Sequence, residues 1–382
     1  MTDTVSWSFP TQVIFGAGAA GQTGRVLAEM GLHKTLIVTD GGVCNAGLLA
    51  PVTAALEQAG VGHEVFDGVK GNPLEEQVVA GHAAYRDGSA DSLVALGGGS
   101  PMDVAKVVAL MVNHREPLET YDDARGGDRH ITEAVPPIVA IPTTAGTGSE
   151  VGRSGVVTLA ATGRKTVFFS PKLLPRAAIL DPELTRSMPP IITAATGFDA
   201  LAHCLEAYAS QGDHPMCDAI ALGGIGLCAR SLERAVERAD DLDARGDMLK
   251  AAMMGAVAFQ KGLGACHSLA HPLSTRAGLH HGLACALTLP AVAQFNLNAP
   301  GRQARYAEVT RLLTGTPDGA GCPAALTALR GRLGLAGGLK EAGVDLGQLE
   351  ALADEAFDDV CHRSNPRPCS RDDLLELYRQ ST

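Results

Sequence analysis

Residue types that bind transition metals recur at helical spacing in the second half of the chain. Asp199 and His203 are four residues apart, so both side chains would lie on one face of a helix. About sixty residues later, His267 and His271 repeat this spacing, and His281 follows soon after. A single one of these histidines would more often be a core or interface residue than a ligand. The set as a whole favours a metal site.

One carboxylate and three imidazoles drawn from such residues suit a divalent transition metal. These donors bind Zn(II) or Fe(II) and leave a coordination position for a substrate oxygen. Ligand type does not decide between the two metals, because zinc binds such a site more tightly whereas cellular supply can favour iron. A metal of either kind would lower the pKa of an alcohol or polarise an aldehyde carbonyl.

Three glycine-rich segments compete for the phosphates of a nucleotide. Gly16–Gly21 has the spacing of the dinucleotide fingerprint, but in a chain with 45 glycines a chance match is about as frequent as a true one. Gly97-Gly98-Gly99-Ser100 is the stronger candidate, because it ends a predicted strand and opens a predicted helix whose free N–H groups favour an anion. The alternative is an ordinary strand-to-helix turn, although consecutive glycines cost backbone entropy.

The third segment, Pro142–Glu150, also follows a predicted strand and carries the hydroxyls of Thr143, Thr144 and Thr147. Ligands of open α/β sheets bind beyond the carboxyl ends of the strands, so this segment and the Gly97 loop would approach the same cofactor. A polar loop without a ligand is the alternative.

Asp40 follows the apolar run Thr35–Thr39. At that place a carboxylate would accept hydrogen bonds from the adenosine ribose and repel a 2′-phosphate, which favours NAD over NADP. The alternative is an aspartate that stabilises a turn with Gly41 and Gly42.

The elements that must position these residues change in character along the chain. Short β-branched runs alternate with helical patterns in the first half, which is typical of a parallel α/β sheet. After Asp181-Pro182, long helical patterns such as Ala200–Ser210 and Arg245–Phe259 predominate. We therefore expect an α/β, Rossmann-like dinucleotide-binding domain over residues 1–185 and an all-α domain over residues 186–382. The strand-like runs are Val13–Phe15, Thr35–Thr39, Ser92–Leu96 and Ile138–Ile141.

Composition narrows the class of protein. A chain of 382 residues with 46% hydrophobic and 19% charged residues has enough apolar material for two compact domains. A net charge of -11 argues against a nucleic-acid or anionic-membrane partner. The nine cysteines include no C-x-x-C pair, and Met1–Pro10 lacks the pattern of a secretory signal. We expect a cytoplasmic protein with reduced thiols.

Taken in order, these segments resemble the iron-containing (group III) alcohol dehydrogenase family, from Phe15-Gly16 to Asn365-Pro366-Arg367. The resemblance implies a metal-dependent homo-oligomer with a catalytic cleft between its domains. The enzyme would transfer a hydride between NAD(H) and a small primary alcohol or aldehyde. It also implies that Asp199, His203, His267 and His281 bind the metal. The cofactor residues it implies are Gly98, Gly99, Ser100, Asp103, Thr143, Thr144, Thr147 and Lys165. Gly97 and Asp40 are predicted as cofactor residues from the sequence pattern described above.

The resemblance places His271 next to the reacting centre. Its ordinary pKa range suits a proton relay, and its spacing puts it one turn from a ligand. The alternative is that His271 only orients the nicotinamide.

The chain departs from the family where an aromatic-Tyr-Asn-x-Pro-His-Gly run is common, because it has Arg276-Ala277-Gly278-Leu279-His280-His281-Gly282 instead. We hypothesise that Arg276 faces the pocket and pairs with an anionic tail of the substrate, as in a semialdehyde, phosphonoaldehyde or sulfoaldehyde. The alternative is an Arg276 that pairs with the protein or points to solvent.

Three other functions fit parts of the pattern. They are a metal-free reductase similar to maleylacetate reductase, a lyase similar to dehydroquinate synthase, and a non-catalytic nucleotide-binding or metal-sensing protein. Sensitivity to a chelator would distinguish a metal-dependent dehydrogenase from the metal-free reductase. Hydride exchange with an alcohol would distinguish the dehydrogenase from the lyase and from the non-catalytic protein.

Overall fold

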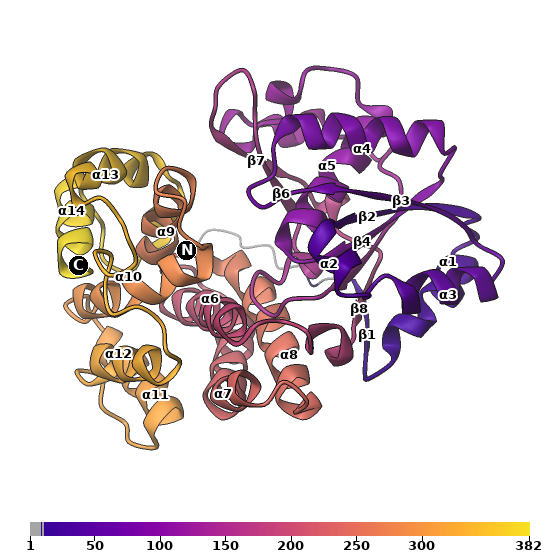
Figure 1. The fold of residues 1–382 in the computed structure, drawn as a ribbon. Helices are drawn as coiled ribbons and strands as arrows, with labels where there is room; N and C mark the ends of the chain where they lie inside the picture. The colour runs from indigo at the N-terminus through magenta and orange to yellow at the C-terminus, as the bar shows by residue number, and fades with distance from the viewer. Residues whose placement is uncertain (1–8, 10) are drawn as a thin grey trace. The chain divides into compact units, whose positions relative to one another are not determined.

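The computed structural model describes residue 9 and residues 11–382, which form two compact units. The α/β unit contains Phe9–Thr144 and Gly148–Ser187 (Figure 1). The helical unit contains, among the described residues, Ala145–Thr147 and Met188–Thr382. The expectation that Met1–Pro10 is no secretory signal concerns residues that, apart from Phe9, lie outside the described part of the chain.

A six-stranded parallel sheet forms the centre of the α/β unit, in the order β1-β8-β5-β4-β2-β3. Side chains along its strands alternate between two apolar clusters. Leu36 and Val38 join one cluster, whereas Ile37 between them joins the other. This alternation is the two-residue period of a strand that is covered on both faces. The strands are β1 (Gln12–Phe15), β2 (Lys34–Asp40), β3 (Gly62–Val69), β4 (Ser92–Gly97), β5 (Ile138–Pro142) and β8 (Ala177–Leu180).

Helices cover the two faces of this sheet. Val26 of α1 (Thr23–Glu29) and Leu56 of α3 (Ala50–Gln58) belong to the cluster around Ile37. Tyr85 of α4 (Glu75–Asp87) and Val104 of α5 (Gly99–Asn113) belong to the cluster around Leu36. The short helix α2 (Gly41–Asn45) follows β2, and an antiparallel hairpin is formed by β6 (Ser154–Thr158) and β7 (Lys165–Phe169).

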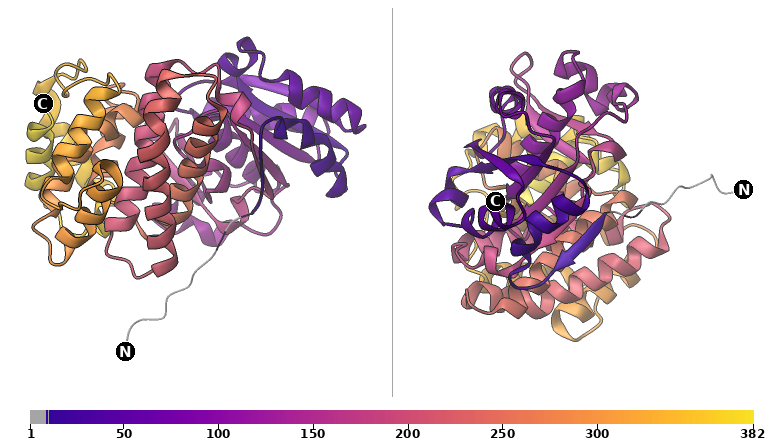
Figure 2. Two further views of the ribbon diagram at one scale, coloured as in Figure 1. Left: turned by 90° about the horizontal axis from the view of Figure 1, so that it is seen from below. Right: turned by 90° about the vertical axis from the view of Figure 1, so that its right-hand side faces the viewer.

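The described residues of the helical unit form helices and loops without a strand (Figure 2). Helix α6 is buried along nearly its whole length and packs against α7, α8 and α10. Gly197 permits this packing, because a Cβ there would lie 2.2 Å from a methyl carbon of Leu232. The helices are α6 (Pro190–Ala209), α7 (Pro215–Glu237), α8 (Leu242–Ala258), α9 (Ala265–Thr275), α10 (His281–Asn296), α11 (Arg302–Thr314), α12 (Cys322–Arg332), α13 (Leu349–Asp358) and α14 (Arg371–Gln380).

The fold class expected from the sequence is confirmed: a parallel α/β unit is followed by a helical one. Strands β3, β6, β7 and β8 were not among the expected runs. The short segment Ala145–Thr147 belongs to the helical unit, although it lies far before the boundary expected at residue 185. Over residue 9 and residues 11–382, no helix is long and apolar enough to cross a membrane.

Candidate active site

The Asp199 carboxylate gathers three imidazoles around one of its oxygens. Asp199 Oδ1 lies 3.5 Å from His281 Nε2, 3.7 Å from His267 Nε2 and 3.8 Å from His203 Nδ1. With metal–ligand bonds of about 2.1 Å, the donor atoms of a tetrahedral site are about 3.4 Å apart. The donor atoms of Asp199, His267 and His281 also lie within 4.8 Å of one another, which suits one coordination sphere, whereas His203 is placed beside Asp199 but outside that close group.

Three helices supply these side chains, and local sequence explains how they converge. Asp199 and His203 occupy successive turns of α6, and His267 lies in the first turn of α9. His281 begins α10, where Gly282 lets this helix approach α6. A Cβ on Gly282 would lie only 2.1 Å from the carbonyl oxygen of Ala195, so no other residue would fit there without a shift.

The electrostatics of the site fit a bound cation. His203 Nδ1 and His267 Nε2 are buried and have no hydrogen-bond partner among the described residues, an arrangement that costs about 1–3 kcal/mol per group. Burial lowers the pKa of His203 to about 4, because a charged ring would lose its hydration and lie near His267. Burial and the neighbouring imidazoles also lower the pKa of His281. Neutral rings of this kind present lone pairs, which is the form that binds metals.

The Asp199 carboxyl group stays ionised because of its imidazole neighbours. Burial alone would raise the pKa of its carboxyl group, but His203, His281 and His267 outweigh burial and lower it far below the usual range. His267 differs from the other two rings, because burial would lower its pKa, but Asp199 and Glu206 outweigh burial and raise that pKa well above the usual value. This ring would therefore release a proton when a divalent ion binds to the set of one carboxylate and three imidazoles.

Glu206 orients one of the predicted ligands. Its Oε2 accepts a hydrogen bond from His267 Nδ1 at 2.6 Å, and its Oε1 accepts one from the Cys266 N–H at 2.7 Å. This pairing directs His267 Nε2 toward Asp199, as carboxylates beside metal-binding histidines commonly do. Sequence reasoning missed Glu206, although its position seven residues after Asp199 on α6 places it on the same helix face.

His271 is held by a second carboxylate. Asp359 Oδ2 accepts a hydrogen bond from His271 Nδ1 at 2.7 Å, while Oδ1 accepts from Ser268 Oγ at 2.7 Å and from the Cys361 N–H at 2.8 Å. Burial would raise the pKa of Asp359, but His271 and Ser268 outweigh it and lower that pKa far below the usual range. The ionised carboxylate fixes the tautomer with hydrogen on Nδ1. The ring stacks on His281, with centroids 5.4 Å apart.

In the α/β unit, the loops after β4 and β5 lie side by side. The Thr143 N–H donates to the Gly97 carbonyl at 2.9 Å, and a Cβ on Gly98 would lie 3.2 Å from Thr144 Oγ1. Gly97 has φ +149°, where a Cβ would also meet Pro101. Gly99 and Ser100 begin α5, so its free N–H groups lie at this edge of the sheet. Thr147 belongs to the helical unit, and its predicted contact with a cofactor stays a prediction.

Asp103 and Lys165 lie near a buried network behind this loop. Asp103 accepts a hydrogen bond from Ser149 Oγ at 3.0 Å, and Lys106 donates to the Ser149 carbonyl at 2.7 Å. Burial raises the pKa of Asp103 to about 6, although Lys106 and Ser149 oppose the rise. Burial lowers the pKa of Lys165, and Asp103 opposes that change. Asp103 thus contacts Ser149 of the protein, and its predicted contact with a cofactor stays a prediction.

Asp40 uses one of its two carboxylate oxygens to cap α2. Its Oδ1 accepts the N–H groups of Gly42 at 2.8 Å and Val43 at 3.0 Å. The turn that the sequence offered as the alternative is therefore present. Oδ2 accepts no hydrogen bond from the described part of the chain, and the predicted contact of Asp40 with a ribose stays a prediction.

Comparison with known proteins assigns the family. Residues 10–182 match the family model for iron-containing alcohol dehydrogenase, and residues 193–382 match the model for the C-terminal region of the Fe-containing alcohol dehydrogenase family. The chain belongs to the iron-containing alcohol dehydrogenase family. It is thus an oxidoreductase that acts on alcohols or aldehydes.

Relatives cover the whole of this dehydrogenase. The 4-hydroxybutyrate dehydrogenase of Cupriavidus necator is 41% identical over 97% of this chain and 98% of its own. The crystal structure of a 1,3-propanediol oxidoreductase has a TM-score of 0.94, with 35% identity and 100% of both chains covered. The sulfoacetaldehyde reductase from Bifidobacterium kashiwanohense, solved in complex with NAD+, has a TM-score of 0.90, with 31% identity and 99% of both chains covered.

The early glycine segment of this dehydrogenase does not offer its amides to a phosphate. The N–H groups of Gly18 and Ala20 donate to the Asp181 carboxylate at 3.1 and 2.9 Å. A carboxylate of the protein thus occupies the place that a phosphate would need, which agrees with the preference for the Gly97 loop.

Arg276 pairs with the protein. Its Nε lies 2.8 Å from Glu355 Oε1, and its Nη2 contacts the same oxygen. The pair links the end of α9 to α13 and is about half exposed. Of the two arrangements considered from the sequence, the structure has the salt bridge, so an anionic substrate would have to share Arg276 with Glu355 or displace it.

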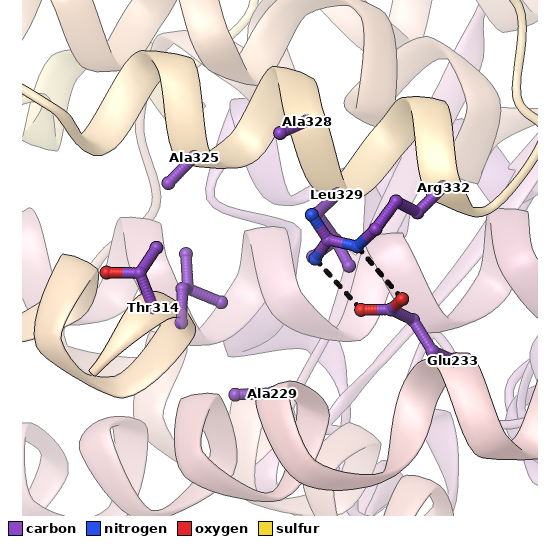
Figure 3. Close-up of a pocket in the computed structure, with 8 residues that line it drawn as sticks. Ala229, Glu233, Thr314, Ala325, Ala328, Leu329 and Arg332 are labelled. Carbon is purple, nitrogen blue, oxygen red and sulfur yellow. Dashed lines mark hydrogen bonds and ion pairs between the residues drawn. The ribbon is translucent and has the colours of Figure 1, made fainter. Parts of the chain in front are cut away.

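A cavity of about 220 Å³ in the helical unit has none of the predicted ligands in its lining, and Figure 3 shows the residues that line it. Its only charged groups, Glu233 and Arg332, form two hydrogen bonds of 2.9 Å with each other. It therefore offers no uncompensated charge to a ligand. The lining residues are Ala229, Glu233, Leu313, Thr314, Ala325, Ala328, Leu329 and Arg332.

Proposed function

We propose that this dehydrogenase uses NAD(H) and one divalent metal to interconvert a small primary alcohol and its aldehyde, with an anionic group at the far end of the substrate. The observation that supports this most strongly is the convergence of Asp199 and three imidazoles, two of which have buried nitrogens without a hydrogen-bond partner among the described residues.

Asp199, His203, His267 and His281 would hold the metal, either Fe(II) or Zn(II). When bound, such an ion supplies Lewis acidity toward an alcohol or aldehyde oxygen. Glu206 keeps the ring of His267 in the orientation that the site needs. The chain's own residues thus prepare the donor set before the ion arrives.

His271 is proposed to move the proton of the alcohol. Because its Nδ1–H is committed to Asp359, its Nε2 carries the lone pair that accepts a proton. Its side chain is 37% exposed, so the proton can pass on to water. Orientation of the nicotinamide by His271 remains the alternative role.

The cofactor is proposed to bind at the carboxyl edge of the sheet in the α/β unit. Gly97, Gly98, Gly99 and Ser100 would bind the diphosphate at the start of α5. Asp40 Oδ2 would accept the ribose hydroxyls, and its charge would repel the 2′-phosphate of NADP. A hydride would pass between the carbinol carbon and C4 of the nicotinamide. The NAD+ complex of the sulfoacetaldehyde reductase supports this choice of cofactor.

The anionic tail is supported by relatives and by one side chain. The names of two relatives specify a carboxylate-bearing and a sulfonate-bearing substrate, 4-hydroxybutyrate and sulfoacetaldehyde. In this chain Arg276 is the proposed contact, because guanidinium binds such groups with two parallel hydrogen bonds. Glu355 would then hold Arg276 in place when no substrate is bound.

Aldehyde reduction by the purified protein tests the proposal. NADH and NADPH oxidation would be followed with a four-carbon semialdehyde that ends in a carboxylate and with butanal, before and after treatment with a chelator. We expect turnover with NADH, a preference for the semialdehyde and loss of turnover with the chelator. Turnover that persists without metal would contradict the metal centre and favour a metal-free reductase. Absence of hydride transfer to both aldehydes would contradict the function.

A further inference from the structure

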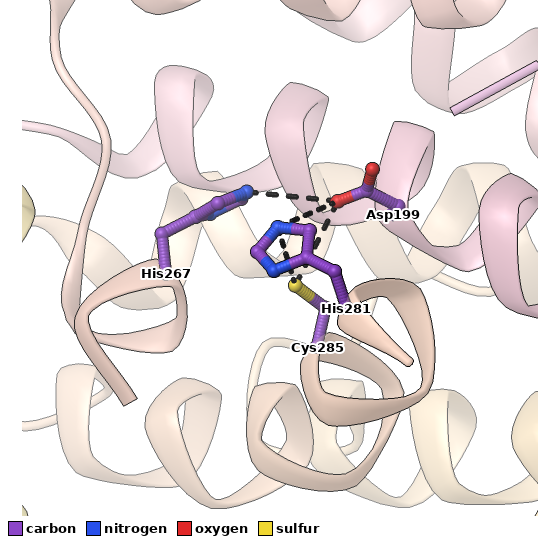
Figure 4. A group of neighbouring side chains, drawn as sticks. All are labelled: Asp199, His267, His281 and Cys285. Atoms are coloured by element: carbon purple, nitrogen blue, oxygen red, sulfur yellow. Dashed lines mark hydrogen bonds and ion pairs between the residues drawn. The ribbon is translucent and has the colours of Figure 1, made fainter. Parts of the chain in front are cut away.

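Cys285 points at the same carboxylate oxygen as the predicted metal ligands (Figure 4). It follows His281 by four residues on α10, so both side chains lie on one face of that helix. Cys285 Sγ lies 3.7 Å from Asp199 Oδ1 and 3.8 Å from His281 Nε2. The thiol is fully buried. The donor atoms of Asp199, His267, His281 and Cys285 all lie within 4.8 Å of one another.

These separations match a coordination sphere that contains sulfur. With a metal–sulfur bond of about 2.3 Å and metal–oxygen or metal–nitrogen bonds of about 2.1 Å, sulfur lies about 3.6 Å from the other donors of a tetrahedral site. The measured separations to Asp199 and His281 exceed this value by only a small margin. A neutral thiol that donates a hydrogen bond to Asp199 is the competing explanation of the same geometry.

A second observation points to a cation at this place. His267 Nε2, on a residue only 1% exposed, faces Asp199 Oδ1 at 3.7 Å, beyond hydrogen-bond length. It has no hydrogen-bond partner among the described residues, and neither has the buried His203 Nδ1. A hydrogen bond from the thiol to Asp199 would leave both nitrogens unsatisfied. A cation bound by the four mutually close donors, Asp199, His267, His281 and Cys285, would satisfy His267 Nε2 together with the sulfur.

We propose that Cys285 is a thiolate ligand of the metal centre and that this sulfur shifts the selectivity of the site from iron toward zinc. The inference rests on the metal centre of the proposed function. As the sulfur–metal bond forms, the thiol releases its proton to solvent and no electrons are transferred. Thiolate is a soft ligand that zinc accepts readily, whereas a set of carboxylate and imidazole alone suits zinc and iron alike.

Cobalt(II) serves as a spectroscopic probe of this sulfur. Metal-free protein would be loaded with Co(II) in the wild type, in Cys285→Ala and in Cys285→Ser. Cys228→Ala is the matched control, because Cys228 is another buried cysteine of the helical unit but lies on α7. We expect a near-ultraviolet sulfur-to-cobalt charge-transfer band in the wild type and in Cys228→Ala. The band should be absent from both Cys285 variants, while the visible ligand-field bands persist.

The outcomes separate this inference from the proposed function. Cobalt bound to the wild type without a charge-transfer band, or a band that survives Cys285→Ala, would overturn the thiolate ligand and leave the metal centre intact. Failure of the wild type to bind Co(II) or Zn(II) would overturn both. Far-ultraviolet circular dichroism of each variant checks that it is folded.

Metal competition gives a second readout that does not depend on turnover. Zn(II) and Fe(II) would compete anaerobically for the metal-free wild type and for Cys285→Ala. We expect zinc affinity to fall by about tenfold or more in the variant, since loss of even an outer-shell partner commonly costs about 10- to 100-fold in metal affinity. Iron affinity should fall less, so the ratio of zinc to iron affinity should decrease. An unchanged ratio would contradict the proposed selectivity.

Discussion

Replacement of Asp359 by asparagine should slow turnover, because it impairs proton transfer through His271. The carboxylate accepts three hydrogen bonds, and the carbonyl oxygen of the substituted amide can keep the two from Ser268 and the Cys361 N–H. The amide N–H₂ would then face His271 Nδ1, where it favours the tautomer with hydrogen on Nε2. That tautomer cannot accept the proton of the alcohol at Nε2.

The size of the effect follows from the hydrogen bond that is lost. A hydrogen bond to a charged group contributes about 1.5–3 kcal/mol, and about 1.4 kcal/mol corresponds to a tenfold rate difference. If the whole free energy of this hydrogen bond stabilises the transition state, its loss should lower kcat by about 10- to 150-fold. Metal content and the KM for NADH should stay the same, because Asp359 contacts none of the four predicted ligands through a hydrogen bond.

Steady-state kinetics in a double-mutant cycle provide the assay. Asp359→Asn should have little further effect in a His271→Ala background, since the residue acts through that ring. Asp358→Asn is the matched control, because it removes an exposed carboxylate at the neighbouring position. Wild-type kcat in Asp359→Asn, or an equal loss in the presence and absence of His271, would refute the reasoning.

Three other substitutions test separate parts of the site. Glu206→Gln should weaken zinc binding by about 10- to 100-fold in competition with a chromophoric chelator, and a dissociation constant within about twofold of the wild type would show that its contact with His267 is not needed. Asp40→Ser can still cap α2 but lacks the charge, so the NADPH to NADH ratio of kcat/KM should rise by about tenfold or more; an unchanged ratio would place the ribose elsewhere. Arg276→Ala should reduce the preference for a carboxylate-bearing aldehyde over a neutral one by about tenfold, and an unaltered preference would remove Arg276 from substrate binding.

The sequence predicts the interior of the sheet better than its edges. Strands β4 and β5 are buried along their whole length, so they appear as continuous apolar runs. Strand β3 is an edge strand that is largely exposed and contains His63, Glu64 and Asp67, so it lacks such a run. Strand β8 is short and includes two alanines, so it carries little strand propensity.

The same contrast holds for the site. The pairs Asp199 and His203, and His267 and His271, can be recognised because a helix turns a four-residue spacing into one face. Glu206 and Asp359 are not predictable in this way, since they meet their histidines across 61 and 88 residues of chain. Cys285 falls between these cases: its helical spacing from His281 is visible in the sequence, but only packing against α6 brings its sulfur to Asp199.

Zinc titration of the metal-free protein tests the central claim most directly. NADH oxidation with the semialdehyde would be measured alongside the bound zinc in the wild type and in Asp199→Ala. We predict that turnover of the wild type rises in proportion to bound metal and reaches its maximum at one ion per chain, whereas Asp199→Ala neither retains zinc nor regains turnover. Full turnover of the metal-free wild type, or stoichiometric zinc binding by Asp199→Ala, would contradict the assignment of this site.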